Sequence, residues 1–181
     1  LPKSVRDAQR ILVWAFPLLL GYGAVSLPSA EWGGRLAIVL GLIVVGTGWS
    51  SFGVVPEAVY NDVLVVVDVA LLILYWLFLF YARLAGTTVV VDCILLHMSG
   101  SIFLLYAVWD FAALAGRDTA ATATEMHLRR FAVLCLLLAV VFFVLGGTIY
   151  LALPSAVALV VRVLGVVVWI TILLSWHCGR F

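Results

Sequence analysis

Long apolar stretches separated by short polar linkers dominate the chain. A membrane-spanning helix needs about 20 consecutive, mostly apolar residues, and six stretches meet this requirement. The predicted spans are residues 9–28, 34–53, 58–84, 88–115, 127–152 and 155–177, each bound being approximate. No region resembles a separate soluble domain. We therefore expect residues 1–181 to form a single transmembrane domain, an all-α bundle of six helices.

The composition supports this interpretation. Hydrophobic residues make up 66% of the chain and charged residues 10%, with a mean hydropathy of +1.28. A soluble domain has about 25% charged residues, so this chain could not cover a water-facing surface, and a lipid bilayer is its expected surroundings. A net charge of +1 gives no argument for nucleic acid as a partner. The three cysteines lie in different apolar stretches without a CxxC pair, which favours small core residues over metal or redox ligands.

Orientation in the membrane follows from the basic residues near the span ends, which collect on the cytoplasmic side. With six spans, both termini lie on one side of the bilayer. That side has Lys3, Arg6, Arg10, Arg117, Arg129, Arg130 and Arg180, and the other has only Arg35 and Arg83. We expect a multi-pass protein of a cell membrane with both termini in the cytoplasm. Aromatic residues near span ends are expected at the interface, namely Trp32, Trp49, Tyr60, Tyr81 and Trp176.

Small residues follow one face of the second predicted span. Gly34, Gly41 and Gly48 recur every seven residues. Small residues let membrane helices approach closely, so tight packing is the favoured interpretation. Passage of a substrate along this face is the alternative.

Polar residues form a line along each of two neighbouring spans. At 100° per residue, four polar residues of the fourth span fall within about 40° of one another; they are Asp92, Ser99, Tyr106 and Asp110. The third span has Asn61, Asp68 and Tyr75 at seven-residue spacing. Lipid cannot satisfy such groups, so both lines should face inward, towards each other or a shared cavity.

A single arginine interrupts the last apolar stretch. Arg162 is the only charged residue between Leu153 and Trp176, and a charge in hydrocarbon is costly enough to need a partner or water. Counting along the helices brings Asp92 and His97 into the same half of the bilayer as Arg162, with Asp68 as another counter-ion. The group is interpreted either as a structural ion pair or as a binding site or conduction path for an anion, a proton or a polar solute.

His97 lies about 140° around its helix from Asp92, so it does not belong to the acidic line. It is expected to be a hydrogen-bonded packing residue or, alternatively, a pH-responsive proton relay. The sequence has no HExxH, GxSxG or P-loop motif. Lys3 is its only lysine, which excludes a retinal Schiff base within a span. We expect no cofactor and no metal site, and we do not favour an enzyme.

These features favour a channel or carrier for an ion or small polar solute, with proton linkage as one form of it. The expected pathway residues are Arg162, Asp68, Asp92, His97, Ser99, Tyr75, Tyr106 and Asp110. The alternative is a lipid- or sterol-binding sensor or partner subunit without transport activity. Whether a homo-oligomer forms, with a pore at the subunit interface, stays open.

Overall fold

The structure is a computed structural model that describes residues 3–52, 60–115 and 123–150, together with Val160 and Val167. Within these residues the chain is helical and has no β-strand. The helices are α1 (Lys3–Ser26), α2 (Trp32–Phe52), α3 (Asp62–Ala82), α4 (Val89–Ala115) and α5 (Ala123–Tyr150).

All five helices of the described part are long and apolar enough to cross a membrane. They correspond to the first five predicted spans. The sixth predicted span, residues 155–177 with Arg162, lies outside the described residues apart from Val160 and Val167. The sequence therefore predicts six spans, whereas the described residues form five.

Three helix starts differ from the predicted spans by four residues or more. Helix α1 begins at Lys3 rather than near residue 9, and α5 at Ala123 rather than near residue 127. The third span was expected to begin at 58, but α3 begins at Asp62. Asn61 has an extended backbone (φ −131°, ψ 175°), and its side-chain oxygen accepts a hydrogen bond from the Leu64 N–H at 3.1 Å. An asparagine in this position satisfies a free amide of the first helical turn and fixes where the helix begins.

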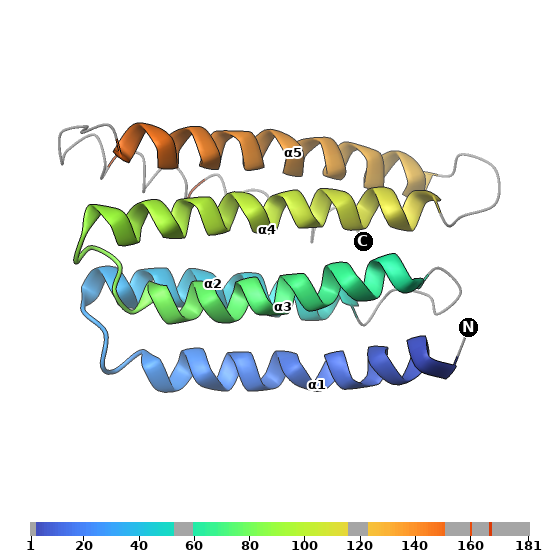
Figure 1. Cartoon of the computed structure of the whole chain (residues 1–181), viewed down its shortest axis with the longest axis horizontal. Helices are drawn as coiled ribbons and strands as arrows, with labels where there is room; N and C mark the ends of the chain where they lie inside the picture. The colour runs from blue at the N-terminus through green and yellow to red at the C-terminus, as the bar shows by residue number, and fades with distance from the viewer. Residues whose placement is uncertain (1–2, 53–59, 116–122, 151–159, 161–166, 168–181) are drawn as a thin grey trace.

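Consecutive helices run antiparallel and side by side (Figure 1). Helices α1, α2 and α3 contact one another, and α4 lies between α3 and α5. The contact between α4 and α5 is the most extensive in the bundle. The described chain thus consists of a three-helix group and a two-helix group, joined mainly across α3 and α4.

The glycines of α2 lie at close helix contacts. A Cβ atom at Gly34 would come within 2.9 Å of the Arg83 carbonyl oxygen, and one at Gly41 within 2.8 Å of a Leu79 methyl carbon. Both distances are shorter than real Cβ contacts allow. The contacts at Gly34 and Gly41 agree with the packing interpretation of the glycine stripe.

Small side chains also bring α4 and α5 together. Ala107 of α4 and Ala132 and Cys135 of α5 are fully buried. Next to them, the rings of Phe103 and Phe142 stack with centroids 5.6 Å apart and an interplanar angle of 10°. Such close approach gives the van der Waals contact that holds helices together in lipid.

The outside of the bundle is apolar along its length. Trp14, Leu18, Val66, Leu137 and Val140 all expose 60% or more of their surface. Large apolar patches are rare on soluble monomers, whereas they suit acyl chains.

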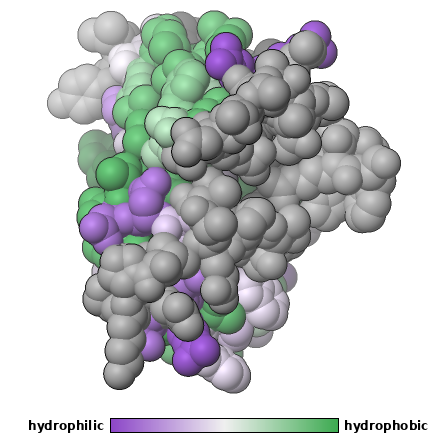
Figure 2. All heavy atoms as spheres, turned by 90° about the vertical axis from the view of Figure 1, so that its right-hand side faces the viewer, coloured by the Kyte–Doolittle hydropathy of each residue, from purple (hydrophilic) through white to green (hydrophobic). Residues whose placement is uncertain are grey.

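The end of the bundle where α1, α3 and α5 begin is called the basic end here. Figure 2 views the molecule from this end and shows hydrophilic residues among the apolar ones. The basic residues of the described helices at this end are Lys3, Arg6, Arg10, Arg129 and Arg130.

Candidate functional site

The polar lines predicted on the third and fourth spans face the interior. Asp68 on α3 is 5% exposed, and Asp92, Ser99 and Asp110 on α4 are 7%, 7% and 2% exposed. The expectation that these groups face inward is confirmed for these four residues. Their role as a pathway stays a prediction.

Asp68 is held by two neutral hydrogen-bond donors from different parts of the chain. The hydroxyl of Tyr60, which lies just before the N-cap of α3, donates to Oδ2 of Asp68. The side chain of Trp109 on α4 also forms a hydrogen bond with Asp68, and indole can only donate. The carboxyl group therefore links the segment just before α3 to the C-terminal part of α4.

Tyr60 is 1% exposed and points inward. Its burial raises the pKa of its phenol above the ordinary value, and the hydrogen bond to Asp68 and the charge of that residue raise it further. Tyr60 consequently keeps its proton and stays a donor at physiological pH. The expectation that Tyr60 lies at the depth of the membrane interface stays a prediction, but its ring is buried and its hydroxyl is turned inward to Asp68.

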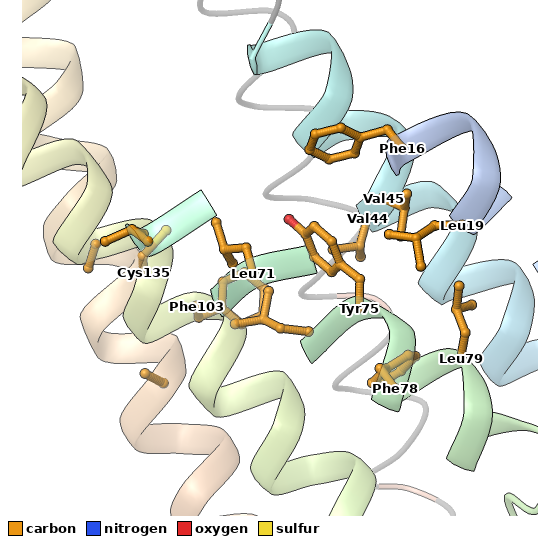
Figure 3. Packing of buried hydrophobic residues seen from close by; sticks show 14 of the residues in the cluster. Phe16, Leu19, Val44, Val45, Leu71, Tyr75, Phe78, Leu79, Phe103 and Cys135 are labelled. Atoms are coloured by element: carbon orange, nitrogen blue, oxygen red, sulfur yellow. The ribbon is translucent and has the colours of Figure 1, made fainter. Parts of the chain in front are cut away.

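The hydroxyl groups of Tyr75 on α3 and Tyr106 on α4 are hydrogen-bonded to each other. Tyr75 projects from α3 into the apolar core, with Phe16 and Leu71 nearby (Figure 3), and its ring centroid is 6.4 Å from that of Phe16. On α2, a Cβ atom at Gly48 would lie 2.8 Å from the Tyr75 hydroxyl and 3.1 Å from the Tyr106 hydroxyl. The pair thus occupies the space that the glycine leaves.

Asp110 extends the polar interior towards α5. It lies four residues after Tyr106, which places the two on the same face of α4. Tyr106 interacts electrostatically with Asp68, Asp110 and Cys135, so groups from α3, α4 and α5 influence one another here. We call the following six residues the polar cluster: Tyr60, Asp68, Tyr75, Tyr106, Trp109 and Asp110.

Asp92 has a different setting, at the end of the bundle opposite the basic end. Its Oδ1 accepts a hydrogen bond from the backbone N–H of Gly86 at 3.0 Å. Gly86 has a φ of +85°, a conformation that favours glycine and that allows the sharp turn between α3 and α4. Asp92 therefore stabilises this turn. Ser99 donates its hydroxyl to the Leu95 carbonyl of its own helix at 2.9 Å.

His97 lies on another face of α4, as its angular position predicts. Its side chain is exposed, and its Nδ1–H donates to the Cys93 carbonyl oxygen at 2.7 Å. The ring packs against Phe143 of α5, with centroids 5.9 Å apart, and a Cβ atom at Gly146 would lie 2.5 Å from it. Asp92 and His97 thus have different neighbours. The expected meeting of both with Arg162 lies outside the described residues.

Two members of the polar cluster, Tyr60 and Trp109, are not predicted by the sequence pattern. Tyr60 precedes Asp68 by eight residues, a spacing that shares a helix face, but the intervening chain is helical only from Asp62. Trp109 is about 100° away from Asp110 on α4, so the alignment of the acidic residues did not point to it. Among the described residues, no group of three or more His, Cys, Asp or Glu side chains could hold a metal ion.

Comparison of the chain with protein-family models, with curated proteins and with solved structures gives no match.

Proposed function

We propose that the chain is a six-span membrane channel or carrier for an ion or small polar solute, and that the polar cluster belongs to its pathway. The observation that carries the proposal is the burial of Asp68 and Asp110 with a tyrosine pair, inside a bundle whose outer surface is apolar. Ionisable groups within membrane spans are costly and commonly mark solute or ion pathways.

The distribution of basic residues supports an orientation. Among the described residues, five basic side chains belong to the basic end and two, those of Arg35 and Arg83, to the opposite end. Basic residues are retained on the cytoplasmic side, so the basic end would face the cytoplasm. A sixth span would return the C-terminus to that side.

The proposed mechanism uses the contact between the two helix groups. Asp68 on α3 and Trp109 on α4 meet across it, as do Tyr75 and Tyr106. A solute that competes for these hydrogen bonds would loosen the contact, and its release would restore it. Arg162, in the predicted sixth span, is the proposed counter-charge for an anionic solute or for Asp68.

Flux into proteoliposomes tests the proposal, with potassium, chloride and proton movements followed separately. Asp68→Asn is expected to lower the transported flux at least about tenfold, since one hydrogen-bonded buried charge contributes on the order of 1.4 kcal/mol or more to binding. Arg162→Ala is expected to lower the flux as well. Asp62→Asn is the matched control, because Asp62 is an exposed acid of the same helix.

Unchanged flux in a folded Asp68→Asn variant would remove Asp68 from the pathway and refute the proposal. A folded wild-type chain that moves none of the three ions and no small polar solute would favour the alternative, a lipid- or sterol-binding sensor or partner subunit.

A further inference from the structure

We propose that Asp68 is a proton-binding site and that Tyr60 and Trp109 position its carboxyl group for taking up and releasing the proton. The inference rests on the proposed function where it names the proton as the transported ion. Proton binding itself can be measured without transport.

The geometry favours a proton over a metal cation. Two donors, the Tyr60 hydroxyl and the Trp109 indole, already point at the carboxyl oxygens of Asp68. A cation such as Ca²⁺ needs six or more oxygen ligands, and it would have to displace both donors. The described residues offer no group of three acidic, histidine or cysteine ligands. A proton needs only one oxygen atom.

The Asp68 carboxyl group can form hydrogen bonds at this site both when it is charged and when it is protonated. In the carboxylate state, Tyr60 and Trp109 both donate to it, which stabilises the anion against the cost of burial. When a hydronium ion gives a proton to Oδ2 and leaves as water, the new O–H bond makes that oxygen a donor. The Tyr60 hydroxyl can then rotate and accept, because a hydroxyl serves in either role. Trp109 continues to donate to the carboxyl group, so no covalent bond other than O–H forms or breaks.

In the part of the chain that the structure describes, five other titratable groups belong to the surroundings of Asp68. The titratable groups of the described helices that interact with it or with its neighbours in the polar cluster are Tyr60, Tyr75, Tyr106, Asp110 and Cys135. Helices α1 and α2 reach the tyrosine pair with Phe16 and Gly48, which carry no charge. Asp110 is thus the other acid of the polar cluster, and its variant is the necessary comparison.

Infrared difference spectroscopy of the full chain in lipid nanodiscs tests proton binding directly. Across the neutral pH range, the wild type should show the carbonyl band of a protonated carboxylic acid that appears on acidification. Asp68→Asn should lose this band, whereas Asp62→Asn and Asp110→Asn should retain it. Tyr60→Phe should retain it with a midpoint about one to two pH units higher, because the carboxylate loses one donor.

A titrating band that persists in Asp68→Asn, or no titrating band in the wild type, would overturn the inference. If Asp68→Asn does not fold, the midpoint of the carbonyl band in Tyr60→Phe and Trp109→Phe provides the test. A midpoint that neither substitution moves would show that these residues do not position the carboxyl group.

Proton flux separates this inference from the proposed function. Vesicles loaded with a pH-sensitive dye and given a pH gradient should acidify through the wild type and at least about tenfold more slowly through Asp68→Asn. Flux of potassium or chloride without any proton movement would overturn the assignment of the proton as the transported ion but keep the proposed function. A titrating Asp68 band without flux of any solute would refute the proposed function and keep the proton-binding site.

Discussion

Replacing Gly48 by alanine tests the packing around the tyrosine pair. The new methyl group would lie 2.8 Å from the Tyr75 hydroxyl and 3.1 Å from that of Tyr106. Ordinary contacts begin at 3.4 Å, so the Tyr75 hydroxyl has to move by about 0.6 Å. Overpacking of a well-packed interior costs about 1–3 kcal/mol. The movement would also lengthen the hydrogen bond between the two tyrosines.

Gly46 provides the matched control on the same helix, because a Cβ atom there meets nothing within 4 Å. Both glycine-to-alanine changes gain about 0.5–1 kcal/mol of helix propensity. This gain cancels in the comparison, so Gly48→Ala is expected to be less stable than Gly46→Ala by about 1–3 kcal/mol.

Reversible unfolding in mixed detergent micelles measures the free energies of unfolding for both variants. In a Tyr106→Phe background, Gly48→Ala should cost less stability than in the wild type, because one of the two hydroxyls near the new methyl group is gone. Equal stability of Gly48→Ala and Gly46→Ala would refute the argument, because the close approach would then cost nothing.

Three further predictions concern Gly146, Asn61 and Tyr60. Gly146→Ala should destabilise the chain by about 1–3 kcal/mol, because its methyl group would lie 2.5 Å from the His97 ring. Gly147→Ala is the control, since a Cβ atom there meets nothing within 4 Å, and equal unfolding curves for the two variants would contradict this. Asn61→Ala should cost about 1 kcal/mol in thermal or detergent unfolding through loss of the α3 N-cap, and no change would exclude that capping role. Burial raises the pKa of Tyr60, so above about pH 10 its phenol ionises in the unfolded chain but not in the folded one. The free energy of unfolding should therefore fall as the pH rises, and it should fall less in Tyr60→Phe. The same pH dependence in both proteins would contradict this.

The sequence predicted the five described helices and their buried faces, because both follow from local periodicity. Asp68 and Asp110 were expected to face inward, and they are buried. The hydrogen-bond partners were harder to predict, since they depend on helix rotation and on side-chain direction. Trp109 reaches Asp68 from a neighbouring helix, and Tyr60 turns back from an extended segment. The Trp109 contact leaves no regular spacing in the sequence, and the eight-residue spacing between Tyr60 and Asp68 does not run along one helix, because α3 begins only at Asp62.

The same limit applies to the acids at the two ends of α4. Asp92 and Asp110 share one helical line and similar burial, so the sequence treats them alike. The structure distinguishes them, because Asp92 accepts a hydrogen bond from the Gly86 backbone in a tight turn, whereas Asp110 lies in the polar cluster with Tyr106. Their roles differ because the loop geometry differs, which a helical pattern does not encode.

The division of the described helices into α1–α3 and α4–α5 has a mechanical consequence. The hydroxyls of Tyr75 and Tyr106 join the two groups by a directional bond, whereas apolar side chains can slide past one another with little loss. Any rocking of one group against the other must first separate these two oxygens. Among the described residues, the hydrogen bond between Asp68 and Trp109 crosses the same contact, so relative motion of the two groups would be resisted at two points. A phenylalanine at position 75 or 106 would remove one of them.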